Sequence, residues 1–298
     1  MNPVHSGIIF LVDIILMLAI QFILSITVGG NGLSMAESVL VSEGICLVPA
    51  SLFAILFRAK AKEAFRFNYV RPSTLGFTAL MVLLLEPLLS ALNAFTMLFT
   101  ENVVAEESAE IVMQGFPKMA FLIAVIAPLA EELLFRGIIL SGLRNGRRII
   151  LAIVLQAVMF GFMHMNLNQM LYACALGFFF GLIVEITDSV WPSIFAHAMV
   201  NMTSVIGIFM IPESEISEIA SGVESKGELM EAFAVSACLA VLTTALACCT
   251  VVRIAKNEPG GMDRLQRIFQ VKDGGHVMSL PSAVALGIAM IVIIIELL

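Results

Sequence analysis

Three charged residues interrupt an apolar segment near the middle of the chain. The segment runs from Ala127 to Gly137 and contains Glu131, Glu132 and Arg136. A charge at the centre of a membrane helix costs about 2.5–3.5 kcal/mol on insertion scales. If the segment crosses a membrane, these side chains must therefore pair with one another or line a polar cavity.

Helix geometry separates the three charges. Glu132 and Arg136 are four residues apart with the glutamate N-terminal, so they can pair along one helix face. Glu131 is rotated by about 100° from Glu132 and is less well placed for the arginine. This segment alone leaves two interpretations open. All three residues form a structural ion cluster, or the Glu132–Arg136 pair supports a Glu131 that acts as a general base.

Two later apolar segments carry histidines. One contains Phe160 and His164, and the other contains His197 and Asn201, which share a helix face. Each has an ordinary structural explanation, as a packed or capping histidine or as an interhelical hydrogen-bond pair. At 1.5 Å per residue, however, Glu131, His164 and Asn201 each lie roughly 20–24 Å from a charged helix end. Three helices that alternate in direction would therefore bring these polar residues to similar depths.

A carboxylate, two imidazoles and an amide at one depth suit hydrolysis. Glu131 and His164 could hold and deprotonate a water molecule, while His197 and Asn201 could donate hydrogen bonds to a tetrahedral oxyanion. Glu131, His164 and His197 could also bind Zn²⁺ or another divalent metal. The sequence has no HExxH spacing, and no serine or cysteine stands beside these residues as an obvious nucleophile.

The elements that position these residues are predicted to be membrane helices. Sixty per cent of the 298 residues are apolar, 13% are charged, and the mean hydropathy is +1.01, whereas soluble domains have about 25% charged residues. The net charge of −7 belongs to the loops and does not indicate nucleic-acid binding. We expect an all-α, polytopic transmembrane helical bundle with eight or nine spans, because 149–186 can be divided in two ways. The apolar segments lie near 7–29, 38–57, 75–99, 117–140, 149–165, 168–186, 190–211, 229–252 and 279–298.

The charged residues between these segments predict the orientation. Basic residues are concentrated at 58–71, 144–148 and 253–272, and acidic residues at 101–110 and 213–228. With nine spans the three basic stretches fall on one side, which should be the cytoplasm. We therefore expect an integral protein of a bacterial plasma membrane with a cytoplasmic N-terminus.

The middle of the chain resembles the CPBP family of intramembrane proteases, which includes CAAX-protein and bacteriocin-processing enzymes. The family signature is Glu-Glu-x-x-x-Arg, Phe-x-x-x-His and His-x-x-x-Asn, and all three motifs occur in that order within about 117–205. The resemblance implies that Glu131 and His164 activate water and that His197 and Asn201 stabilise the oxyanion. It makes Glu132, Arg136 and Phe160 supporting residues.

The resemblance also predicts how the chain is organised and what it does. We expect N-terminal spans in 1–115, a catalytic core in 116–211, and C-terminal spans with a cytoplasmic loop in 212–298. The predicted activity is endopeptidase cleavage of a membrane-associated protein or peptide, by a Glu/His-activated water or a bound metal. The alternatives are a non-catalytic scaffold or immunity protein of the same fold, and a proton-coupled transporter that relays protons through the buried Glu and His.

Overall fold

The helical bundle expected from the sequence is confirmed. The structure is a computed structural model, and it describes residues 1–27, 33–56, 61–100, 103–144, 148–212, 226–270 and 276–297. Within these ranges all regular structure is helical. This is the outcome expected for a lipid-embedded chain, because each helix satisfies its own backbone hydrogen bonds.

Six helices in the described ranges are long and apolar enough to cross a bilayer. Two further apolar helices are shorter: α9 (Ile149–Met163) and α15 (Leu280–Glu296). The long helices are α1 (Pro3–Thr27), α2 (Met35–Leu56), α4 (Pro72–Met97), α10 (Leu167–Thr187), α11 (Trp191–Met210) and α13 (Lys226–Asn257).

The predicted segment 117–140 forms a helical run with two π-helical parts. π-Helical turns are rare and are frequently found at functional sites. The nine predicted apolar segments thus each fall on a helix or on this run. In chain order, the run consists of α6 (Phe116–Phe121), η3 (Leu122–Ile126), α7 (Ala127–Glu132), η4 (Leu133–Ile139) and α8 (Leu140–Leu143).

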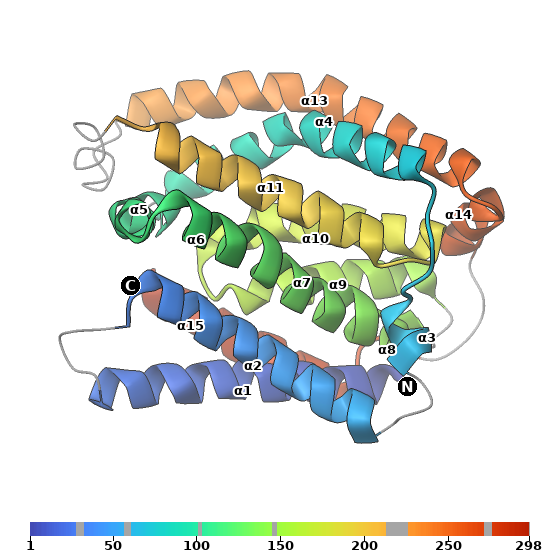
Figure 1. The fold of residues 1–298 in the computed structure, drawn as a ribbon, viewed down its shortest axis with the longest axis horizontal. Helices are drawn as coiled ribbons and strands as arrows, with labels where there is room; N and C mark the ends of the chain where they lie inside the picture. Colours follow the sequence, from blue (N-terminus) through green and yellow to red (C-terminus); the bar gives the residue numbers. More distant parts are fainter. Residues whose placement is uncertain are drawn as a thin grey trace.

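The helices lie side by side along the long axis of the molecule (Figure 1). Helix α4 packs along α13, and α1 packs along α15, so spans from the two ends of the chain form joint outer layers. The run from α6 to α8 lies between these layers with α9, α10 and α11. One buried apolar cluster contains residues from all of these layers. The regions 1–115, 116–211 and 212–298 therefore contribute to a single hydrophobic core.

Basic residues from the three predicted stretches meet at one end of the bundle. Glu185 of α10 lies 2.6 Å from Arg66 and 3.7 Å from Arg144. The Arg264 side chain, on α14 (Gly261–Phe269), donates a hydrogen bond of 2.6 Å to the carbonyl of Ile186. These contacts between distant parts of the chain support the prediction that the basic stretches share one side.

The two chain ends lie at opposite ends of the bundle. Figure 1 places the N-terminus beside α3 (Ala61–Phe65) and α8, and the C-terminus near α5 (Val103–Gln114). This arrangement agrees with an odd number of crossings. Several predicted loop charges lie outside the described residues: Arg58, Lys60, Glu101, Arg147, Glu213, Glu215, Glu218, Glu224 and Lys272.

A buried turn joins α9 to α10 and determines where His164 lies. The fifteen residues of α9 span about 22 Å, which is short of the hydrocarbon core of about 30 Å. Met165 then adopts a left-handed conformation with φ of 52°. The Asn166 side chain caps α10 by accepting a hydrogen bond of 2.8 Å from the Gln169 amide. Because α9 ends early, the His164 side chain lies within the bundle.

Candidate active site

Glu132 connects the two motifs that the sequence places on different helices. Its Oε1 accepts a hydrogen bond of 2.7 Å from Nη1 of Arg136 and another of 2.9 Å from Nδ1 of His197. Glu132 and Arg136 have no exposed surface, and His197 is 5% exposed. The predicted pairing of Glu132 with Arg136 is therefore present, and it extends to the imidazole of α11.

The bond to Glu132 determines what the other nitrogen of His197 can do. A carboxylate accepts hydrogen bonds, so Nδ1 of His197 carries a proton and donates it. Nε2 is then a lone-pair acceptor when the ring is neutral and a donor only when the ring is protonated.

Glu131 faces the free nitrogen of His197. Its Oε2 lies 3.8 Å from Nε2 of His197, which is too long for a direct hydrogen bond. A water molecule that contacts both atoms could bridge a gap of this length. Oε2 of Glu131 is buried and has no hydrogen-bond partner among the described residues. The two adjacent glutamates thus face different nitrogens of His197, and Glu132 is the one that also bonds to Arg136.

His164 presents one free nitrogen from the end of α9. Its Nδ1 lies 3.0 Å from the carbonyl oxygen of Phe160, which can only accept, so Nδ1 is the donor. Nε2 of the neutral ring is left as an acceptor that could hold a water molecule. The turn is held by Asn166, whose side chain donates a hydrogen bond of 2.9 Å to the His164 carbonyl.

The Phe160 ring packs against the other predicted residues. It lies 5.3 Å from the His164 ring and 5.8 Å from the His197 ring, centroid to centroid. The guanidinium carbon of Arg136 lies 4.2 Å from the Phe160 centroid, in a cation–π contact. Phe160 therefore brings the two histidines and the arginine together, although they come from three different segments.

Asn201 contacts the π-helical part of the central run. Its amide nitrogen donates a hydrogen bond of 2.8 Å to the carbonyl oxygen of Ile123 in η3. One of its two N–H groups remains for another acceptor. Asn201 and His197 therefore both face the run from α6 to α8, one bonded to η3 and the other to α7.

Three buried groups near the site were not identified from the sequence. Phe180 of α10 lies 5.8 Å from the His197 ring, and its ring centroid is 5.3 Å from the guanidinium carbon of Arg136. Glu43 of α2 and Asp13 of α1 lie within electrostatic range of Glu131. Phe180 is one of 21 phenylalanines, and the two carboxylates lie far from the motifs in sequence, so only packing reveals them.

The predicted metal ligands do not form a metal site in this arrangement. Among the residues that the structure describes, no group of three or more His, Cys, Asp or Glu side chains is placed to hold one ion. Glu131 and His197 approach each other, whereas Nδ1 of His164 is engaged by a backbone carbonyl. Binding of Zn²⁺ or another divalent metal by Glu131, His164 and His197 therefore stays a prediction.

The fold and site define a polytopic membrane protein with a buried carboxylate–imidazole centre. Comparison with protein families agrees: residues 113–203 match the type II CAAX prenyl endopeptidase Rce1-like family. This range contains all three motifs, so the recognition of the CPBP family from those motifs is confirmed over the core of the chain.

A curated protein matches part of this chain. The chain is 35% identical over 95 residues to a protein of Bacillus subtilis (strain 168) named "Putative membrane peptidase YdiL". The matched region is 32% of this chain and spans 39% of the length of that relative. No solved structure matches this chain.

Proposed function

We propose that this protein is an intramembrane endopeptidase that hydrolyses peptide bonds with a water molecule activated by Glu131 and His164. The observation that carries the proposal is the separation of 3.8 Å between Oε2 of Glu131 and Nε2 of His197. Both residues are buried, and Oε2 of Glu131 has no hydrogen-bond partner among the residues that the structure describes. A reacting oxygen beside this pair, off the line that joins the two atoms, could contact the Glu131 carboxylate as a base and Nε2–H of His197 as a donor.

In the first step the water molecule is deprotonated and attacks the substrate. Nε2 of His164 accepts a hydrogen bond from the water and orients it, and the Glu131 carboxylate removes one proton. The hydroxide oxygen bonds to the carbonyl carbon of the substrate, and the carbonyl oxygen becomes the oxyanion. Among the described residues, Glu131 has no ion-pair partner closer than 3.8 Å, so its carboxylate is available to accept this proton.

The second step breaks the peptide bond. The protonated His197 donates Nε2–H to the oxyanion, and Asn201 donates its free N–H. The proton on Glu131 passes to the nitrogen of the leaving amine as the carbon–nitrogen bond breaks. The products are one carboxylic acid and one amine, and Glu131 returns to its carboxylate form.

The proposed substrate is a membrane-associated protein or peptide. A catalytic centre within the bundle is reached most directly from the bilayer, so a substrate held in the membrane is favoured. The matching family is described as CAAX prenyl endopeptidases, which makes a prenylated C-terminal peptide one probe. Unlipidated transmembrane peptides are the second probe. They represent the other two proposed kinds of substrate, bacteriocin leaders and membrane-protein segments, which carry no prenyl group.

The test uses the full chain purified into liposomes. Each probe is incubated in H₂¹⁸O and the products are identified by mass spectrometry. We expect one ¹⁸O atom in the new carboxylate, and we expect Glu131→Gln and His164→Ala to abolish cleavage while the protein still inserts. Glu86→Gln is the matched control, because Glu86 is a half-buried membrane glutamate on α4 that belongs to none of the three motifs. Full cleavage by Glu131→Gln would exclude this mechanism.

Two further measurements decide between the proposal and its alternatives. Metal analysis of the purified active protein tests the predicted divalent metal separately from cleavage. A scaffold or immunity protein would keep its cellular effect in the Glu131→Gln variant. A transporter would move protons or solute across the liposome membrane without cleaving either probe.

A further inference from the structure

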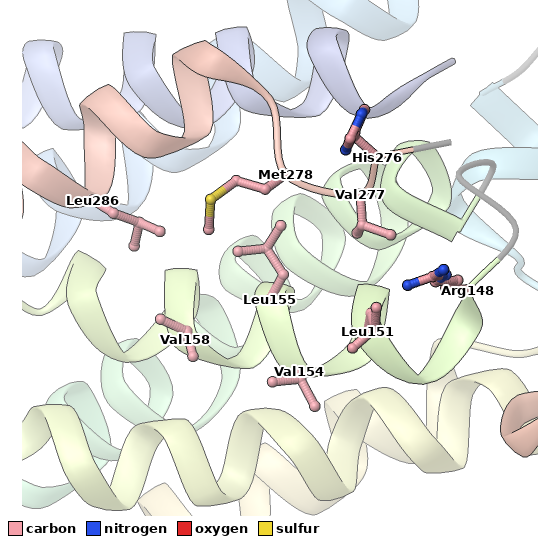
Figure 2. Close-up of a pocket in the computed structure, with 9 residues that line it drawn as sticks. All are labelled: Arg148, Leu151, Val154, Leu155, Val158, His276, Val277, Met278 and Leu286. Atoms are coloured by element: carbon pink, nitrogen blue, oxygen red, sulfur yellow. The ribbon is translucent and has the colours of Figure 1, made fainter. Parts of the chain in front are cut away.

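A groove lies between α9 and the segment leading into α15, on the side of α9 that faces away from the catalytic residues. Its volume is about 700 Å³, within the range of about 300–1,000 Å³ for small-molecule sites. Leu151 and Met278 are 43% and 52% exposed, so the groove opens to the surface of the bundle. The described residues that line it are Arg148, Leu151, Val154, Leu155, Val158, His276, Val277, Met278 and Leu286 (Figure 2).

The polar and apolar residues of the groove are separated along its length. Figure 2 shows Arg148 and His276 toward one end and Val158 and Leu286 at the other. The lining between these ends is aliphatic or methionine. Among the described residues, no carboxylate lies within ion-pair distance of the Arg148 side chain. The Arg148 guanidinium is therefore an unpaired cation, among the described residues, at one end of a largely apolar groove.

The position of the groove in the bundle places Arg148 near the expected level of the membrane surface. Arg148 directly precedes α9 at the end where Arg144, Arg66 and Glu185 meet. From Leu151 to Val158 the wall of α9 extends by roughly 10 Å. One leaflet accounts for about half of the hydrocarbon core of about 30 Å. The apolar part therefore lies in the leaflet whose headgroups are level with Arg148.

We propose that this groove binds one anionic phospholipid, with its phosphate against Arg148 and one acyl chain along Leu151, Val154 and Val158. Charge complementarity selects the occupant: an acyl chain alone would need no cation, and a soluble anion would need no apolar channel. Basic pockets between membrane helices commonly bind anionic headgroups in this way. The site lies behind α9, so a bound lipid would stabilise the helix that carries Phe160 and His164.

The test measures which lipid the protein retains. The full chain is reconstituted in nanodiscs containing equal amounts of phosphatidylglycerol and phosphatidylcholine, and native mass spectrometry then identifies the lipid retained after mild release. We expect one retained phosphatidylglycerol. Arg148→Ala should lower its preference over phosphatidylcholine by about five-fold, the effect expected for one basic residue near an anionic lipid. Arg148→Lys should keep most of the preference.

Two other variants separate the groove from general surface charge. Arg253→Ala removes an exposed arginine of α13 that does not line the groove, and it should leave the preference unchanged. Val158→Trp fills the apolar end and should reduce retention while Arg148 remains. Equal retention of both lipids by the unmodified protein would overturn the proposal, as would an equal loss in Arg253→Ala. Displacement of the lipid by a prenylated peptide would also overturn it, because the groove would then hold substrate.

Discussion

Oε1 of Glu132 is shared by Arg136, at 2.7 Å, and by Nδ1 of His197, at 2.9 Å. The arginine neutralises the carboxylate, and the carboxylate orients the imidazole and fixes which of its nitrogens is free. Glu132 is thus a positioning residue for His197. Partners of this kind, one step removed from the reacting atoms, typically change activity by about 10–100-fold when they are lost.

Glu132→Gln should reduce kcat by about 10–100-fold with a smaller effect on KM, because His197 loses its orienting charge. It should also lower the free energy of unfolding by about 3–5 kcal/mol, since Arg136 is left buried and unpaired. Cleavage kinetics and thermal unfolding in detergent measure the two effects. Glu185→Gln is the control, because Glu185 forms a buried ion pair of 2.6 Å with Arg66 outside the site. It should lower stability and leave kcat of the folded protein intact, and an equal fall in kcat would contradict the positioning role.

Removing both partners of the ion pair should cost less stability than the sum of the two single changes. We expect the double variant Glu132→Gln and Arg136→Met to recover about 1–3 kcal/mol relative to that sum, because no unpaired charge remains in the bundle. Chemical denaturation of all four proteins provides the measurement. Strictly additive losses would show that the two side chains are not coupled.

Phe160→Leu should lower stability by about 2 kcal/mol and reduce cleavage. The change removes the ring that stacks on Arg136 at 4.2 Å and contacts both histidine rings. Phe178→Leu, on the neighbouring α10, is a matched change whose described ring contact is with Phe179. If both variants behave alike, Phe160 has no special role in holding the site.

Gly177→Ala should separate α9 from α10. A Cβ at Gly177 would lie 2.8 Å from the Cα of Ala157, a backbone atom that cannot rotate away. We expect a loss of about 1–3 kcal/mol and a fall in cleavage, because α9 carries Phe160 and His164. Gly76→Ala is the control, since nothing lies within 4 Å of its added Cβ. Thermal unfolding of the two variants provides the comparison, and unchanged stability of Gly177→Ala would mean that the two helices tolerate separation.

The basic end of the bundle should face the cytoplasm. A fluorescent protein fused to the N-terminus should therefore fold and fluoresce, while alkaline phosphatase fused to the C-terminus should be active outside the membrane. The reverse pair of fusions serves as the control. Activity of phosphatase at the N-terminus would reverse the proposed orientation without altering the active site.

Local features of this site were accessible from the sequence alone. The nine apolar segments mark the helices because a span needs about 20 apolar residues. The Glu132–Arg136 pair follows from the helix period, which depends only on residues four apart. The three motifs also lie within residues 113–203, which match the Rce1-like family.

Contacts between helices depended on the tertiary structure. Helix geometry separates Glu131 from Glu132, but it does not show which of them bonds to α11. Only the packing of the helices shows that Nδ1 of His197 bonds to Glu132. The same holds for the bond from Asn201 to Ile123, and for the groove that Arg148 and His276 both line. Each of these contacts depends on how a helix is rotated against its neighbours. That rotation is determined by the packing of the whole bundle, which no single segment encodes.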